Sequence, residues 1–172
     1  MPLLRLISLS TLCLLTACAS TARPRPALTR TVVIPPGWDS AYDTYHYAPA
    51  VRVGDTVVVS GIPASGGDTY EAKIRGMFER LKSVLDASGA SLADVVEITT
   101  FHAQVHGTEE FQGEFSQFLK IHKEYFTSTY PAWTAVGTTA LLAKDAPVEM
   151  RAVAIVGSGV HAQLERKAHR SP

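Results

Sequence analysis

The sequence is poor in cysteine: only Cys13 and Cys18 occur, and both lie close to the N-terminus. The remaining chain therefore offers no thiol for a disulfide or for a cysteine nucleophile. Net charge is absent as well, because sixteen basic residues balance sixteen acidic ones. Without a charge excess or an evident basic stripe, a nucleic acid is not the expected partner.

The common catalytic and metal-binding motifs are also missing from the sequence. No HExxH, CxxC or aspartate-rich loop occurs, and neither a G-x-S-x-G elbow nor a phosphate-binding loop is present. His102 and His106 lie on an expected strand and loop, where their spacing separates the side chains by about 13 Å, too far to share one ion. We therefore predict no metal site; His46 and His122 have no partner nearby in the sequence.

The first residues have the pattern of an export signal. Arg5 precedes an apolar run of about ten residues, which is too short to span a bilayer. The run ends in LTAC, residues 15–18, which resembles the bacterial lipobox. This resemblance implies cleavage before Cys18, lipid attachment to Cys18 and anchoring to a membrane of the bacterial cell envelope, on the periplasmic side. The alternative is an ordinary secretory signal in which Cys18 occurs by chance.

Composition divides the chain into four parts. We expect a signal peptide over residues 1–17, a lipidated tether over 18–30, one folded domain over 31–157 and a charged tail over 158–172. The tether is small, polar and proline-containing, whereas the tail ends in ERKAHRSP. An apolar fraction of 46% is typical of a globular domain with a sizeable core.

Hydrophobic periodicity predicts both strands and helices in the domain. Gly54 and Asp55 separate two β-branched runs, as in a hairpin. The first amphipathic pattern opens with Asp68 and Glu71 at the spacing of a capping box. After the hairpin we expect a helix over 68–87, a strand over 95–105, a helix from 108, a strand over 133–141 and a strand over 148–156.

This order of elements predicts an α+β fold, in which two helices cover one face of a single sheet. The other face of the sheet would have no cover from the same chain. Its strands are too apolar to face water comfortably, so we expect the chain to associate with copies of itself.

Glu149 stands out because it lies within the apolar run VEMRAVAIV, residues 148–156. Strand alternation places Glu149, Arg151 and Val153 on one face. Burying an unpaired carboxylate costs on the order of several kcal/mol, so Glu149 needs a partner or a function. Either it pairs with Arg151 on an open sheet face, or it lies in a cleft where it orients a water or accepts a proton.

Four stretches of the domain resemble the YjgF/Rid (reactive intermediate deaminase) family: YAPAVRVGDTVVVSGIP, LKSVLDASGASLADVVEITTF, YPAWTAV and APVEMRAVA. They occur in the family's order, between about residues 45 and 155. The resemblance implies a chorismate-mutase-like α+β fold and a homotrimer with small-molecule clefts between its subunits. It also implies hydrolysis of 2-imino acids or their enamine tautomers to 2-keto acids and ammonia, without a cofactor.

The resemblance also assigns roles to individual residues. Tyr47 would line the cleft, the backbone of Gly61 would face the ligand, and the backbone of Ala135 would contact substrate. Glu149 matches the glutamate that is proposed to position the attacking water. Trp133 falls where the deaminases carry the arginine of Pro-Ala-Arg.

That arginine would bind a substrate carboxylate through its planar fork. Arg52 and Arg151 are candidates to replace it. Trp133 instead offers an apolar wall and a face for a cation, which suits an amine, an iminium or an aromatic ligand. In the other interpretation, Trp133 fills the core or plugs a closed cleft.

Two functional hypotheses follow from these observations. The first is an exported, lipid-anchored trimer that hydrolyses an imine or enamine, with altered substrate preference because Trp133 replaces the arginine. The second is a surface lipoprotein trimer that binds a small ligand or docks a partner without catalysis.

Overall fold

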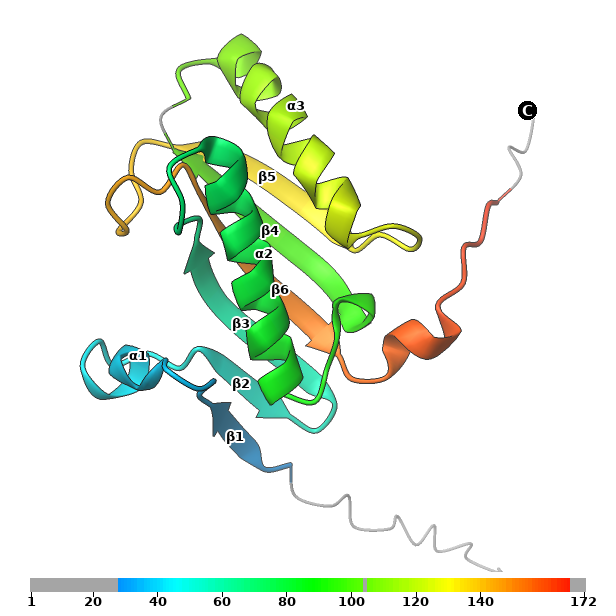
Figure 1. Ribbon diagram of the computed structural model, residues 1–172. Helices are drawn as coiled ribbons and strands as arrows, with labels where there is room; N and C mark the ends of the chain where they lie inside the picture. The colour runs from blue at the N-terminus through cyan, green and yellow to red at the C-terminus, as the bar shows by residue number, and fades with distance from the viewer. Residues whose placement is uncertain (1–27, 104, 168–172) are drawn as a thin grey trace, which may run out of the picture.

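The computed structural model describes residues 28–103 and 105–167, which form one sheet with helices on one side (Figure 1). The strands in this part of the chain are β1 (Arg30–Val33), β2 (Ala50–Val53), β3 (Thr56–Pro63), β4 (Val95–Ala103), β5 (Ala132–Thr138) and β6 (Val148–Ile155). The helices are α1 (Asp39–Asp43), α2 (Tyr70–Ala87) and α3 (Thr108–Tyr125), with short 3₁₀ turns η1 (Leu92–Asp94) and η2 (Ser158–His161).

The six strands form one sheet in the order β1-β2-β3-β6-β4-β5. Neighbouring strands run antiparallel, except that β4 and β5 are parallel. Parallel strands need a crossover connection, and α3 provides it between β4 and β5. β6 follows the other strands in the sequence but lies at the centre of the sheet, between β3 and β4.

Local chemistry sets where α2 begins and ends. The side chain of Thr69 accepts a hydrogen bond from the backbone N–H of Ala72 at 3.2 Å and so caps the helix. The cap is therefore one residue later than the expected Asp68. Gly89 follows the helix with a φ of 74°, the left-handed conformation in which many helices end. The hairpin turn likewise has Gly54 at a φ of 59°.

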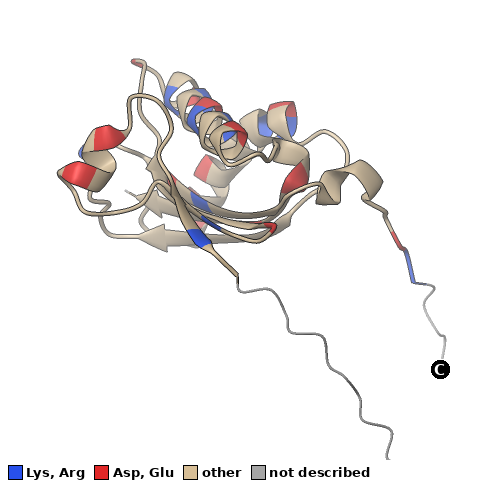
Figure 2. Ribbon diagram, turned by 90° about the horizontal axis from the view of Figure 1, so that it is seen from below, with Lys and Arg blue, Asp and Glu red and all other residues tan. Residues whose placement is uncertain are grey.

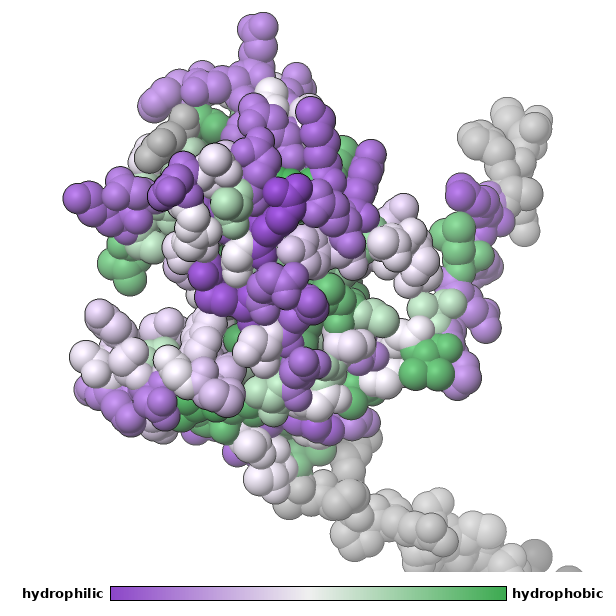
Figure 3. Space-filling model, viewed as in Figure 1, coloured by the Kyte–Doolittle hydropathy of each residue, from purple (hydrophilic) through white to green (hydrophobic). Residues whose placement is uncertain are grey.

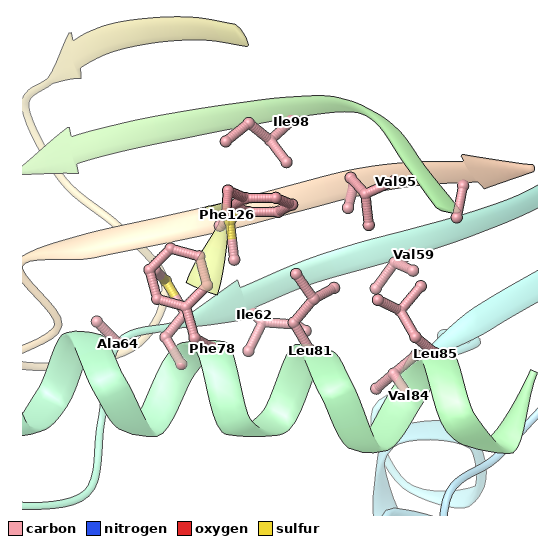
Figure 4. Packing of buried hydrophobic residues seen from close by; sticks show 14 of the residues in the cluster. Val59, Ile62, Ala64, Phe78, Leu81, Val84, Leu85, Val95, Ile98 and Phe126 are labelled. Atoms are coloured by element: carbon pink, nitrogen blue, oxygen red, sulfur yellow. The ribbon is translucent and has the colours of Figure 1, made fainter. Parts of the chain in front are cut away.

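The hydrophobic core lies between the sheet and the two long helices. Figure 4 shows Phe78, Leu81 and Leu85 of α2 facing Val59 and Ile98 of the sheet. These side chains are all fully buried. Burying one large apolar side chain stabilises a fold by about 1.5–3 kcal/mol. The apolar face of α2 therefore stabilises the fold by packing against the sheet.

The structure adds elements that the periodicity does not predict. β1 pairs with β2 from Arg30 onward, at the end of the expected tether, and α1 follows it. In the expected tail, η2 is held where the backbone N–H of Gly159 donates to Asp94 at 3.0 Å. The strands expected over 95–105 and 133–141 end earlier, at Ala103 and Thr138. The expected signal peptide, Cys18 and most of the tether lie outside the described residues.

The long helices lie on the same side of the sheet, and no helix of the described chain covers the opposite face (Figure 2). That face carries apolar side chains, of which Val58 and Val136 are 43% and 38% exposed. The side formed by α2 and α3 instead presents hydrophilic side chains (Figure 3). The α+β fold predicted from the sequence is therefore confirmed, with one sheet face left without cover.

None of the helices in residues 28–103 and 105–167 is both long and apolar enough to cross a membrane.

Candidate functional site

An open cavity of about 750 Å³ lies on the uncovered side of the sheet, beside β3 and β6. Its walls come from the segment before β2, the end of β3, the start of β6 and the loop between β5 and β6. The lining residues are Tyr45, Tyr47, Ser60, Gly61, Pro63, Leu142, Ala143 and Glu149. A cavity of this size accommodates a small-molecule ligand.

Glu149 projects into the cavity across the backbone of Gly61. A Cβ atom built at Gly61 would lie only 2.8 Å from Cδ of Glu149, so a larger residue at this position would push the carboxylate aside. The pairing of β3 with β6 shifts register between Val59 and Ile62. Such irregularities re-aim side chains next to functional sites. The structure thus brings together Gly61 and Glu149, two of the residues that the resemblance assigns to the cleft.

Partial burial raises the pKa of the Glu149 carboxyl above its usual value. The Glu149–Arg151 ion pair considered from the sequence does not form, because Arg151 pairs with Glu97 at 3.3 Å. Among the described residues no lysine, arginine or histidine forms an ion pair with Glu149. A half-buried carboxylate of this kind is suited to act as a general base.

Two tyrosines form the outer wall of the cavity. Tyr45 and Tyr47 flank His46, which has a φ of 57°, a left-handed conformation that is uncommon outside glycine and asparagine. The hydroxyl of Ser60 donates to the carbonyl oxygen of Ala48 at 2.7 Å and ties this segment to β3. Ser60 therefore fixes the position of the segment that carries the two tyrosines. Tyr47 lines the same cavity as Glu149.

Trp133 lies on the opposite, helix-covered face of the sheet. It pairs with Ile98, which is fully buried beneath the helices. Its indole stacks on the imidazole of His122 in α3, with ring centroids 4.5 Å apart and an interplanar angle of 13°. Its Nε1 atom donates to the Thr100 hydroxyl at 3.0 Å. Within the described chain, Trp133 therefore does not line the cavity, and its contacts support the core interpretation.

Ala135 shares the face of Trp133, because it pairs with the fully buried Thr100. The cavity thus contains Tyr47, Gly61 and Glu149 from the predicted site, but neither of the two residues predicted on β5. A role for Trp133 or Ala135 in a cleft between subunits stays a prediction.

Neither arginine that could replace the family's arginine reaches the cavity. Arg52 lies on the helix side, where it donates to the carbonyl oxygens of Ser88 at 2.9 Å and of Gly54 at 2.8 Å. Arg151 lies on the uncovered face but is paired with Glu97. Both arginines therefore hold structural contacts.

The buried histidines belong to the core rather than to a metal centre. His102 contacts Glu114 through Nδ1 at 2.6 Å and Thr100 through Nε2 at 2.8 Å. Because an ionised carboxylate only accepts hydrogen bonds, His102 donates to Glu114 through Nδ1. The second Glu114 oxygen accepts from the Tyr70 hydroxyl. In the described ranges, no group of three or more His, Cys, Asp or Glu side chains could hold a metal ion.

Several lining residues were not predicted as site residues from the sequence. Tyr45, Ser60 and Pro63 lie near predicted residues, and Ser60 and Pro63 belong to the first family-like stretch, but the resemblance assigns none of the three a role. Leu142 and Ala143 belong to a loop whose position depends on the pairing of β6 with β3. Neither spacing nor composition could have assigned these two residues to the cavity.

Known proteins with similar sequences and structures identify the family of the chain. A family model described as Endoribonuclease L-PSP matches residues 39–156. RutC family protein YjgH of Escherichia coli is 32% identical over 127 residues, which cover 70% of this chain and 92% of that protein. The human protein named 2-iminobutanoate/2-iminopropanoate deaminase is 32% identical over 127 residues, covering 69% of this chain and 85% of the relative. The solved structure of Rv2704 from Mycobacterium tuberculosis, described as a member of the YjgF/YER057c/UK114 family, is 30% identical with a TM-score of 0.64, covering 74% of this chain and all of that one.

The mixed sheet, its single helix layer and the carboxylate in an open cavity define an α+β protein with an open, carboxylate-bearing cavity on the uncovered face of its sheet. The chain belongs to the YjgF/RutC/Rid family, to which the Endoribonuclease L-PSP model corresponds. The family predicted from the four sequence stretches is thereby confirmed.

Proposed function

We propose that this protein hydrolyses a reactive imine, or its enamine tautomer, to a carbonyl compound and ammonia. Relatives from several animals carry the name 2-iminobutanoate/2-iminopropanoate deaminase. The observation that carries the proposal is the half-buried Glu149 carboxylate, which lies over the backbone of Gly61 in an open cavity.

Glu149 would accept a proton from a water molecule as that water attacks the imine carbon. The imine nitrogen, protonated from solvent before the attack, becomes the amine of a neutral carbinolamine. The proton on Glu149 then passes to this nitrogen, and ammonia leaves as the hydroxyl returns its proton to Glu149 and the carbonyl double bond forms. One imine and one water give one carbonyl compound and one ammonia. A positioned general base contributes a rate factor of roughly 10² to 10⁴.

The substrate preference would differ from that of imino-acid deaminases. Trp133 occupies the position at which the deaminase pattern has arginine, and its ring is fixed against His122 on the helix side. A fork that binds carboxylate bidentately is thus missing at this position. We expect 2-imino acids to be poorer substrates than imines without a carboxylate.

We also propose that the protein is anchored to a membrane of the cell envelope and that it forms a homotrimer. The LTAC sequence supports lipid attachment at Cys18 after export, and the apolar uncovered face supports a homotrimer in which neighbouring chains bury that face. Replacing Cys18 with serine should move the protein from the membrane fraction to the soluble fraction of the envelope. Light scattering of the domain without residues 1–18 should give three times the mass of one chain.

The catalytic proposal is tested by ammonia release. Imines are generated in the assay by an amino-acid oxidase or by an amine oxidase, and the release of ammonia is followed with and without the protein. Glu149→Gln should lower the protein-dependent rate by about 10²-fold or more. Glu71→Gln, on the exposed side of α2, is the matched control and should leave the rate unchanged. The proposal fails if the unaltered protein adds nothing to the rate in buffer for either imine source.

The alternative is a protein that binds a small ligand, or docks a partner, without catalysis. The absence of an arginine at position 133 favours this alternative, because the deaminase pattern places its substrate anchor there. Saturable binding of an imine analogue without ammonia release would establish the binding function.

A further inference from the structure

We infer that the cavity selects a ligand with a positively charged nitrogen and an apolar body, and that it discriminates against an α-carboxylate. If the proposed function holds, the substrate is then the iminium form of an imine derived from an amine rather than from an amino acid. The inference concerns ligand class, so it can be tested by binding alone.

The wall of the cavity carries a negative charge and no positive one among the described lining residues. Glu149 is the carboxylate among the lining residues, and the described lining contains no lysine, arginine or histidine. Opposite charges attract and like charges repel, and both effects are stronger beside a partly buried group than in bulk water. A ligand cation is therefore attracted to Glu149, and a ligand carboxylate near it is repelled.

The two candidate anion-binding cations, Arg52 and Arg151, do not line the cavity. Arg52 is held by the carbonyl oxygens of Ser88 and Gly54 on the helix side. Arg151 is paired with Glu97. To bind a ligand carboxylate in the cavity, either side chain would have to give up these contacts.

Position 133 supplies no cation to the cavity. The Trp133 ring is held on the helix side by stacking on His122 and by the hydrogen bond to Thr100. The tryptophan therefore removes a cation and also fills the space on the helix side.

Much of the remaining wall is aromatic or apolar. Tyr45 and Tyr47 are 72% and 40% exposed, and aromatic rings at such positions attract cations through their faces. Leu142 and Pro63 supply apolar surface for the body of the ligand. A carboxylate, two phenol rings and an apolar wall together match a cation on an apolar skeleton.

Lys144 is the side chain that could reverse this assignment. It follows Ala143 in the loop that forms one wall, and it is exposed. If this lysine turned into the cavity, it would pair with a ligand carboxylate. The test therefore includes Lys144→Ala.

The experiment measures binding of three unreactive ligands by ligand-observed NMR titration at pH 7. Benzylamine is a cation, benzyl alcohol has the same skeleton without charge, and phenylglycine adds an α-carboxylate to benzylamine. We expect benzylamine to bind about ten-fold more tightly than either of the others. Glu149→Gln should weaken benzylamine binding about ten-fold and leave benzyl alcohol unchanged, whereas Glu71→Gln should change neither.

The inference is overturned if phenylglycine binds as tightly as benzylamine, if benzyl alcohol does, or if benzylamine shows no saturable binding. Loss of phenylglycine binding in Lys144→Ala would then identify Lys144 as the carboxylate partner. Thermal unfolding of each variant confirms that it is folded.

The ligand class and the catalytic proposal can fail separately. Benzylamine binding without ammonia release from any imine would support the ligand class and contradict the catalytic proposal. Hydrolysis of imino acids without benzylamine binding would support catalysis and contradict the ligand class.

Discussion

The backbone of Gly61 lies directly beneath the side chain of Glu149, close enough that a Cβ atom on Gly61 would come within 2.8 Å of the Glu149 Cδ atom. The glycine is needed for this contact and not for its backbone dihedral angles, since Gly61 is not among the residues with positive φ. The position of the carboxylate is thus determined by a residue on another strand.

Gly61→Ala should displace the Glu149 carboxylate while leaving the sheet intact. A shift of about 1 Å at a catalytic group can cost 10²-fold in rate, so we expect a loss of ammonia release of that order. Gly113→Ala is the matched control, because a Cβ at Gly113 meets no atom within 4 Å and the position is helical. The control should gain about 0.5–1 kcal/mol of stability and keep its activity. Unchanged activity in Gly61→Ala would show that the position of Glu149 does not matter for the rate.

Glu149→Gln should stabilise the protein at neutral pH. Burial raises the pKa of Glu149 in the folded chain, so between the ordinary and the raised pKa the folded state binds more protons than the unfolded state. Stability therefore falls as pH rises through this window. The variant lacks this loss, and its free energy of unfolding at pH 7 should exceed that of the wild type by no more than about 1 kcal/mol. Urea unfolding at pH 4 and pH 7 measures the difference, which should vanish at the lower pH.

His122 should make the stability of the protein sensitive to acid. Burial lowers the pKa of His122 to about 4, so below the usual histidine pKa the unfolded chain binds a proton that the folded chain does not. Stability from this group is complete above pH 6.5 or so and is lost as pH falls toward 4, by on the order of 2 kcal/mol.

His122→Phe removes this proton difference and also the buried Nε2 atom, which has no hydrogen-bond partner in the described structure. The variant should lose less stability than the wild type between pH 7.5 and pH 5 in urea unfolding. His161→Phe, at an exposed position in η2, is the control and should follow the wild-type pH dependence. Parallel curves for His122→Phe and the wild type would contradict the assignment.

Trp133 can be assigned to core or site by comparing stability with binding. Trp133→Phe loses the hydrogen bond to Thr100 and should cost about 1 kcal/mol. Trp133→Ala also loses the stacking on His122 and should cost about 3 kcal/mol, at the lower end for a large aromatic residue because Trp133 is only partly buried. Benzylamine binding by Trp133→Phe should equal that of the wild type. Lost binding with unchanged stability would instead place Trp133 in a ligand cleft.

Sequence reasoning predicts elements whose signal is local. The amphipathic pattern of α2 and the Gly54–Asp55 turn each arise within a few residues, and both elements form as expected. β1 is four residues long with no clear alternation, and it becomes a strand only because β2 offers an edge for pairing. A short edge strand of this kind carries little information in its own sequence.

The relative placement of Trp133 and Glu149 shows why the rest of the site could not be predicted. Alternation along one strand shows which residues share a face, but not how the faces of two strands correspond. That correspondence comes from pairing register: Trp133 pairs with Ile98, and Ile98 pairs with Ala152. Ala152 has the opposite orientation to Glu149 on β6, so the two candidates separate onto the two faces of the sheet.

The position of β6 has a consequence for how the protein is made. Among the strands of the described chain, β6 is the last to leave the ribosome, yet it joins β3 to β4 at the centre of the sheet. Until residues 148–155 are available, β1, β2 and β3 cannot be joined to β4 and β5. Folding must then close pairings between distant segments, which is slow relative to forming local contacts. A nascent chain that lacks residues 148–155 is therefore kept from completing the sheet.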